Sequence, residues 1–124
     1  MLKIISTDSE RTIGFTITGH IKSEDLDLAT TAIAQKLATH DKQTHPKLRV
    51  YAELNRLQGI SFLALLKDLQ FTLKHWQAFE KEAIVTDSKW WPRLTLIANK
   101  IAPGIEVKYF PLKEKDAAWR WVHT

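Results

Sequence analysis

The spacing of hydrophobic and polar positions changes along the chain between a period of two, typical of β-strands, and a period near 3.6, typical of helices. Short β-prone runs predict strands at residues 2–7, 13–18, 48–54, 83–85 and 105–110. The polar turn between the first two runs indicates a hairpin. In the third run, the alternation places Leu48, Val50, Ala52 and Leu54 on one side, so we expect a central or near-central strand.

Segments with the longer period predict helices. Ser23 is the expected N-cap residue of the first helix, because its hydroxyl can accept a hydrogen bond from a free backbone N–H. The hydrophobic face of that helix is formed by Leu26, Ala29, Ile33 and Leu37. Further helices are expected at residues 61–79, 92–101 and 114–122.

The resulting order of elements, β-β-α-β-α-β-α-β-α, predicts an α/β fold. Alternating strands and helices imply a mixed, mainly parallel sheet with right-handed crossovers, in a sandwich of about five strands and about four helices. A chain of 124 residues matches the size of a single compact domain, and no repeat or linker divides it. We therefore expect one domain over residues 1–124.

Composition narrows the classes of partner and compartment. The formal charge of +4 gives a weak attraction to anionic partners, but basic residues are spread from Lys3 to Arg120, so nucleic acid is not an expected partner. The lack of cysteine excludes disulfides and thiolate metal sites. No apolar run approaches the roughly 18 residues of a spanning helix, and residues 1–10 lack the regions of a signal peptide. A cytoplasmic protein is the resulting expectation.

Motifs of catalysis are missing from the sequence. It contains no Gly-x-Ser-x-Gly elbow, no Gly-rich phosphate loop and no His-Glu-x-x-His pair. The histidines are dispersed along the chain, which is a poor pattern for a metal site. We therefore expect a noncatalytic binding module with no cofactor and no metal.

Several short stretches, taken in order, resemble one family of small bacterial proteins. They are Gly19-His20-Ile21, Glu24-Asp25, residues 48–54, residues 69–75, residues 83–85, Asp87-Ser88-Lys89-Trp90, Tyr109-Phe110 and residues 117–121. Together they are similar to the SpoIIAA-like family. The resemblance implies a fold related to the STAS domain and to lipid-binding CRAL-TRIO modules. It also implies binding of apolar ligands or association with membranes, and it implies no particular reaction.

The stretch Gly59-Ile60-Ser61 departs from true STAS domains. Anti-sigma factor antagonists carry a phosphorylated serine at this place, commonly within an Asp-Ser-Ser-Gly run. Ser61 is open to two interpretations: an ordinary helix N-cap, which is the commoner role, or a phosphorylation site at the positive end of the helix dipole. The second interpretation predicts a STAS-type regulatory module for protein–protein interaction, switched at or near Ser61.

The tryptophans all lie in the last half of the chain, and two of them suggest a ligand site. The leading hypothesis is that an apolar, lipid-like molecule enters the space between the helices at 61–79 and 92–101, through a hinge near the Trp90-Trp91-Pro92 turn. The expected ligand-binding residues are Phe62, Leu66, Leu69, Trp76, Trp90, Trp91, Leu94 and Ile97. The alternative is that these side chains only fill the core.

Basic and aromatic side chains predict a contact surface. Phe71 points away from the hydrophobic stripe of its helix, among cationic groups, which suits a second subunit or anionic headgroups. The expected membrane or partner contacts are Lys67, Phe71, Lys74, Lys89 and Arg93. A homodimer and peripheral contact with the inner membrane face follow as expectations. Trp119 and Trp121 lie about 200° apart on the last helix, so one should pack on the sheet and the other should contact a different element, a partner or solvent.

Overall fold

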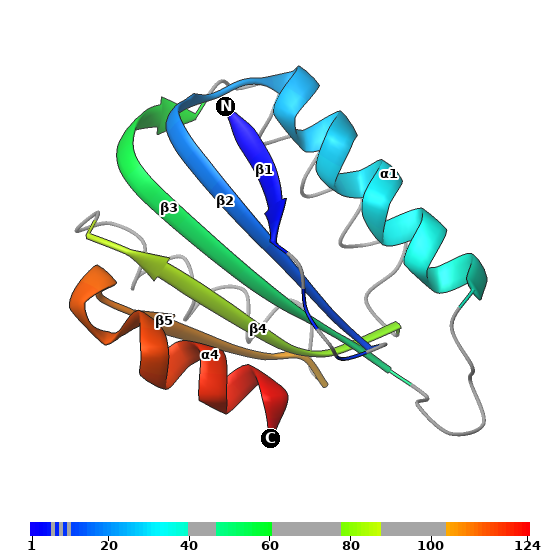
Figure 1. The fold of residues 1–124 in the computed structure, drawn as a ribbon. Helices are drawn as coiled ribbons and strands as arrows, with labels where there is room; N and C mark the ends of the chain where they lie inside the picture. The colour runs from blue at the N-terminus through cyan, green and yellow to red at the C-terminus, as the bar shows by residue number, and fades with distance from the viewer. Residues whose placement is uncertain (6, 8, 10, 40–46, 61–77, 88–103) are drawn as a thin grey trace.

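The computed structural model describes residues 1–124 except 6, 8, 10, 40–46, 61–77 and 88–103 (Figure 1). Its strands are β1 (Leu2–Ile5), β2 (Thr12–Ile21), β3 (Leu48–Ile60), β4 (Phe79–Thr86) and β5 (Glu106–Phe110). Its helices are α1 (Ser23–Thr39), the short 3-10 helix η2 (Leu112–Glu114) and α4 (Lys115–His123). The predicted α/β class is confirmed.

The strands form one five-stranded mixed sheet in the order β1-β2-β3-β4-β5. β1 pairs with β2 in the antiparallel sense, as the predicted hairpin requires. β2, β3, β4 and β5 pair in the parallel sense, each with the strand that follows it in the chain. Parallel neighbours need a crossover connection, which explains why α1 lies between β2 and β3 in the sequence.

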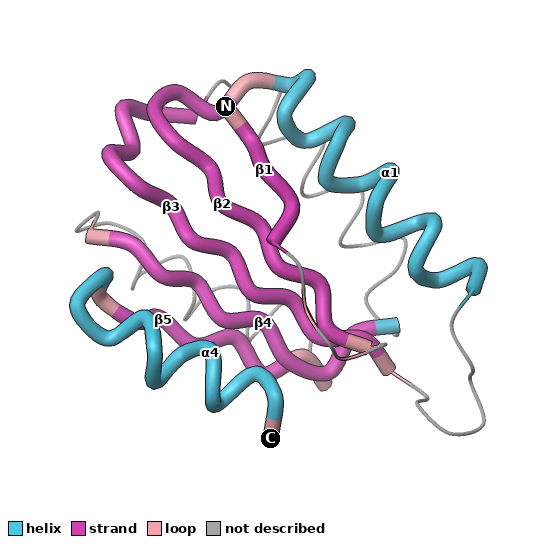
Figure 2. The backbone as a smooth tube through the Cα atoms, viewed as in Figure 1, coloured by secondary structure: helices cyan, strands magenta, loops and turns pink. Residues whose placement is uncertain are grey.

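The two α-helices of the described part of the chain pack on opposite faces of the sheet, and the side chains of one strand alternate between those faces. On β3, Val50 and Leu54 belong to the hydrophobic cluster that contains Ala29 and Ile33 of α1. Tyr51 belongs to a second cluster, with residues of α4. Figure 2 shows α1 and α4 at opposite ends of the sheet in this view.

Helix α1 follows its predicted pattern with one correction at its start. Ala29 and Ile33 are buried, and the predicted partners in the stripe, Leu26 and Leu37, pack against the same cluster. Ser23 is the first helical residue rather than the N-cap. The carbonyl of Lys22 accepts the first helical hydrogen bond, from Leu26, and the N–H of Lys22 donates to Asp25 Oδ2 at 3.0 Å. A carboxylate that reaches back in this way caps the helix one residue earlier than predicted.

Strand β4 is longer than predicted. It begins at Phe79, a residue that the sequence placed at the end of a helix, and Phe79 is buried in the α1-side cluster. The charged run Glu80-Lys81-Glu82 hides this part of the strand from a search for hydrophobic alternation. Residues 61–77 of that predicted helix and all of the predicted helix at 92–101 lie outside the described residues, among which there are two α-helices.

Candidate functional site

The sequence-predicted site residues lie outside the part of the chain that the structure describes. This holds for the expected ligand-binding residues Phe62, Leu66, Leu69, Trp76, Trp90, Trp91, Leu94 and Ile97. It holds equally for the expected contact residues Lys67, Phe71, Lys74, Lys89 and Arg93, and for Ser61. Those assignments stay predictions, and the described residues provide two other concave surfaces.

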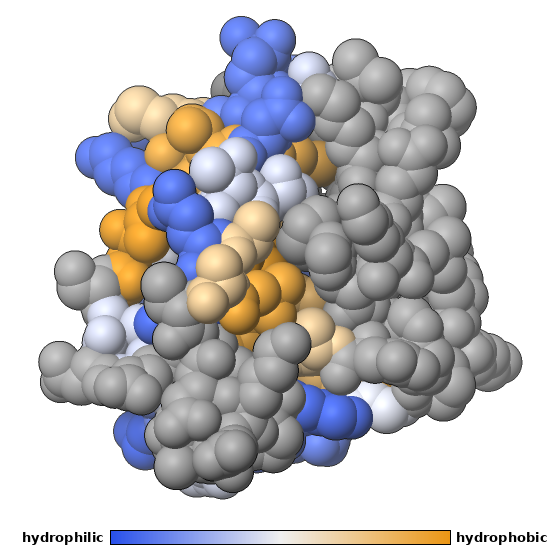
Figure 3. All heavy atoms as spheres, turned by 90° about the vertical axis from the view of Figure 1, so that its right-hand side faces the viewer, coloured by the Kyte–Doolittle hydropathy of each residue, from blue (hydrophilic) through white to orange (hydrophobic). Residues whose placement is uncertain are grey.

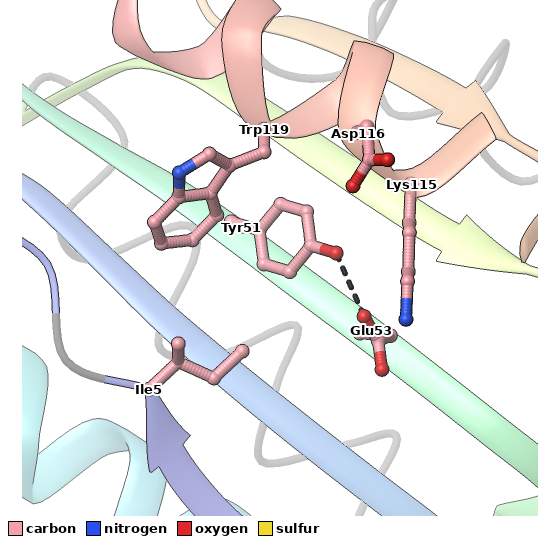
Figure 4. Close-up of a pocket in the computed structure, with 6 residues that line it drawn as sticks. All are labelled: Ile5, Tyr51, Glu53, Lys115, Asp116 and Trp119. Atoms are coloured by element: carbon pink, nitrogen blue, oxygen red, sulfur yellow. Dashed lines mark hydrogen bonds between the residues drawn. The ribbon is translucent and has the colours of Figure 1, made fainter.

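The first surface is a polar pocket on the α4 side of the sheet, with a volume of about 190 Å³ (Figure 4). Its lining residues are Ile5, Tyr51, Glu53, Lys115, Asp116 and Trp119. Tyr51 and Glu53 are two residues apart on β3, so both face α4. Trp119 lies one helical turn beyond Lys115, so the two side chains are on the same side of α4 and both line the pocket.

Gly14 makes room for this arrangement. It pairs with Ile5 on β1 and with Tyr51 on β3. A Cβ atom at Gly14 would lie 3.0 Å from the Cβ of Ile5 and 3.4 Å from Cζ3 of Trp119. Only glycine therefore lets the Trp119 ring settle on β2 without displacing the edge strand.

Both tryptophans of α4 contact the sheet, on different strands, whereas the sequence predicted that only one of them would. Trp119 packs on the sheet with its ring centroid 4.9 Å from that of Tyr51 and the two planes at 86°. Trp121 lies beside Phe110 of β5, and the ammonium groups of Lys81 and Lys108 lie 5.1 and 5.3 Å from its ring centroid.

A hydrogen-bonded carboxylate forms the polar wall of the pocket. The Tyr51 hydroxyl donates to Glu53 Oε1, and the Asn55 amide donates to Glu53 Oε2, both at 2.8 Å. Burial raises the pKa of Tyr51 well above its ordinary value, and the hydrogen bond to Glu53 and the negative charges of Glu53 and Asp116 raise it further. Tyr51 is therefore a neutral phenol that donates a hydrogen bond at physiological pH. The alternation of Tyr51, Glu53 and Asn55 is the sequence signal for this wall.

The second surface is an apolar groove of about 540 Å³ between β1 and α1. Its lining residues are Ile4, Glu24, Asp27, Leu28, Thr31, Ala32 and Gln35. The α1 members recur every three or four residues and so form one stripe of the helix. Ile4 and Leu28 are 60% and 57% exposed, which is unusual for large hydrophobic side chains beside one another. Figure 3 shows hydrophobic surface between hydrophilic residues on this side of the molecule.

The groove runs along an edge of the described sheet, since β2 is the one described strand that pairs with β1. Met1 and Thr18 exchange hydrogen bonds in both directions, at 2.7 and 2.9 Å. In an antiparallel pair such positions alternate, so Lys3 and Ile5 also bond to β2, while the backbone groups of Leu2 and Ile4 point to the open edge.

The described residues contain neither a membrane-spanning helix nor a cluster of metal ligands. No described helix is long and apolar enough to cross a membrane. Over the same residues, no group of three or more histidine, aspartate or glutamate side chains is placed to hold a metal ion.

Comparison with known proteins agrees with the resemblance noted in the sequence. The sequence model of the SpoIIAA-like family matches residues 12–123. A similar solved structure is that of an uncharacterized protein of the DUF3478 family from Shewanella loihica PV-4, which has a SpoIIAA-like fold. The two chains are 26% identical with a TM-score of 0.75, and the alignment covers 98% of this chain and 92% of the other. No curated protein matches the chain.

Proposed function

The chain belongs to the SpoIIAA-like family, and we propose that it is a noncatalytic interaction module that binds an extended segment of a partner protein along the β1 edge. The observation that supports this proposal is the open edge of β1 beside the apolar groove of α1. An edge strand offers backbone hydrogen bonds, and a groove beside it offers contacts for side chains. Together they are the two components of recognition by strand addition.

The backbone component comes from Leu2 and Ile4. Their N–H and C=O groups point away from β2, and no described strand pairs with them. Such groups on an edge strand are a template for another strand. Each hydrogen bond gained there contributes about 0.5–1.5 kcal/mol. Because Lys3 and Ile5 bond to β2, an added strand would leave the sheet of this protein unchanged.

The side-chain component comes from Ile4 and Leu28. Full burial of such a side chain is worth about 1.5–3 kcal/mol, so covering the exposed half of each contributes about 1 kcal/mol per residue. The groove volume of about 540 Å³ falls within the usual range for binding sites. A partner strand on β1 would place every second side chain over this groove.

Charge indicates the composition of the partner segment. Glu24 lines the groove and favours a basic group next to the apolar ones. Lys3 is exposed and, one residue from Leu2 and Ile4, lies on the opposite face of the edge, where it favours an acidic side chain. A second copy of β1 brings its own lysine to this edge, and edge lysines oppose such pairing. We therefore propose a different protein as the partner.

The other sequence-based hypotheses stay predictions. They are the apolar, lipid-like ligand between the helices at 61–79 and 92–101, contact with a membrane, a homodimer through the Phe71 face, and regulation at Ser61. Native mass spectrometry of the purified protein tests the first and the third. Tryptophan fluorescence with anionic liposomes tests the second, and partner capture by Ser61→Ala and Ser61→Asp tests the fourth.

The strand-addition proposal is tested by crosslinking followed by a backbone substitution. A photoreactive benzoylphenylalanine at position 28 should crosslink a partner in cells, and the same group at exposed Lys113, at the other end of the molecule, should not. Ile4→Pro removes an N–H that the sheet does not use, and proline is tolerated at such an edge position. Ile4→Val is the matched control, because it keeps that N–H.

With the crosslinked partner purified, Ile4→Pro should weaken binding by at least about tenfold, a loss of about 1.4 kcal/mol, and Ile4→Val by less than about twofold. Calorimetry gives both affinities. Equal binding by the proline variant, or equal crosslinking from position 113, would contradict the proposal.

A further inference from the structure

We propose that the polar pocket beside α4 binds a small organic cation of the alkylammonium class, with quaternary ammonium compounds as its best ligands. The pocket lies on the face of the sheet opposite the groove, so this site is separate from the proposed partner surface. Its volume of about 190 Å³ is below the roughly 300 Å³ at which drug-sized ligand sites begin, so the ligand is small.

The first component of the site is the negative charge of Glu53. Its oxygens each accept one hydrogen bond, from the hydroxyl of Tyr51 and the amide of Asn55. These neutral donors fix the direction of the carboxylate and leave its charge in place. Within the described residues Glu53 forms no ion pair, because the two ion pairs found there join Arg11 and Arg49 to Glu80.

The second component is the aromatic wall. The rings of Tyr51 and Trp119 meet at 86° with their centroids 4.9 Å apart, so they line the pocket from two directions. The face of an aromatic ring carries partial negative charge and attracts a cation, most strongly where water is excluded. Figure 4 shows the rings and Ile5 on one side of the pocket and the charged groups on the other. Rings combined with a carboxylate are the usual means of recognising quaternary ammonium groups.

The remaining charges keep the pocket negative. Asp116 adds a second carboxylate and Lys115 one ammonium, so the three charged side chains among the described lining residues carry a net charge of −1. The side chains of Lys115 and Asp116 begin at the exposed start of α4. The ammonium group of Lys115 would repel a bound cation. Its removal should therefore strengthen cation binding and weaken anion binding, which makes it the most discriminating position.

The probe is choline, and its uncharged analogue of the same shape, 3,3-dimethyl-1-butanol, is the matched control. Each is titrated into the full chain while the side-chain resonances of Trp119 and Tyr51 are followed by NMR. We expect choline to bind with a dissociation constant on the order of 1 mM, near −4 kcal/mol. The neutral analogue should bind at least about tenfold more weakly, because only the charge distinguishes the two.

Three variants extend the test. Glu53→Gln should weaken choline binding about tenfold, the size of one charge-assisted contact. Lys115→Gln should strengthen it by about two- to fivefold, and Asp116→Asn should weaken it by a similar factor, since both alter one exposed charge. Lys115 and Asp116 are exposed, so we expect both of these variants to fold.

Equal binding of the neutral analogue would overturn the proposal, because the pocket would then recognise shape alone. Acetate or phosphate binding that is lost in Lys115→Gln would also overturn it, in favour of an anion site. Choline binding that is indifferent to the three variants would place the ligand elsewhere on the molecule and contradict the assignment.

Discussion

Gly14→Ala is the substitution whose effect the structure fixes most closely. The added methyl would lie 3.0 Å from the Cβ of Ile5 and 3.4 Å from the far edge of the Trp119 ring. Ile5 cannot retreat easily, because its own backbone pairs directly with Gly14. The Trp119 ring is also held, by Tyr51 on one side and by His123, whose ring centroid is 4.5 Å away, on the other.

The expected cost follows from two opposing effects. An extra methyl in a packed site costs about 1–3 kcal/mol. Replacing glycine by alanine lowers the conformational entropy of the unfolded chain, which stabilises the folded state by about 0.4–1 kcal/mol. This gain applies here because φ is not positive at this position, so alanine is not strained. The net loss of unfolding free energy is therefore about 1–2 kcal/mol, measured as a lower midpoint in urea with an unchanged slope.

Gly19 provides a control with a different mechanism. It has φ +79°, and a Cβ atom at this position would meet nothing within 4 Å, so the strain of alanine there lies in the backbone alone. At Gly19 asparagine should be tolerated better than alanine, because it adopts a left-handed conformation more readily. At Gly14 the larger side chain should be worse. A Gly14→Ala protein as stable as the parent, with the Trp119 contact to Tyr51 intact by NMR, would refute this reasoning.

Two further predictions concern buried polar groups. Arg49 is buried, lies 2.6 Å from Glu80 and donates to the carbonyl of Val122. Arg49→Met should therefore lower the free energy of unfolding in urea by about 2–4 kcal/mol. Arg11→Met breaks a more solvent-accessible ion pair to the same Glu80 and should cost less than about 1 kcal/mol; equal losses would contradict this account. The raised pKa of Tyr51 means that the folded state holds its proton more tightly than the unfolded state, whose pKa is near 10. Its contribution to stability is therefore complete below pH 10 and is lost as the pH rises above 10. Tyr51→Phe should flatten this decline in stability when urea titrations are repeated at a series of alkaline pH values. An unchanged decline would assign the loss of stability to other groups.

The sequence predicted one face of β3 well and the other face poorly. Leu48, Val50 and Leu54 alternate as core residues should, and the structure places all three in the hydrophobic cluster that includes Ala29 and Ile33 of α1. Tyr51 and Glu53, on the opposite face, form a pocket together with residues of α4, and α4 comes much later in the chain. Periodicity identifies the face on which a residue lies and carries no information about the element that covers that face.

The errors at element ends have local causes. The helix assigned to 61–79 extended too far because Phe79 fits the period of a helix as well as that of a strand, and short apolar segments leave this ambiguity open. The cap of α1 was placed one residue late because both Ser23 and Asp25 are suitable capping residues. Their hydrogen bonds, and not their residue types, decide which residue precedes the first turn.

Helices α1 and α4 become available at very different times during synthesis. Helix α1 directly follows β2 in the chain, whereas the buried hydrogen bond from Arg49 to Val122 joins residues 73 positions apart. At a translation rate of about 5–20 residues per second, α4 emerges roughly 4–15 s after the part of β3 that it covers. For that interval Tyr51 lacks its α4 cover, and Ala83 and Val85 lack it from the moment they emerge. The apolar residues on this face of the sheet are therefore exposed on the nascent chain for several seconds before α4 covers them.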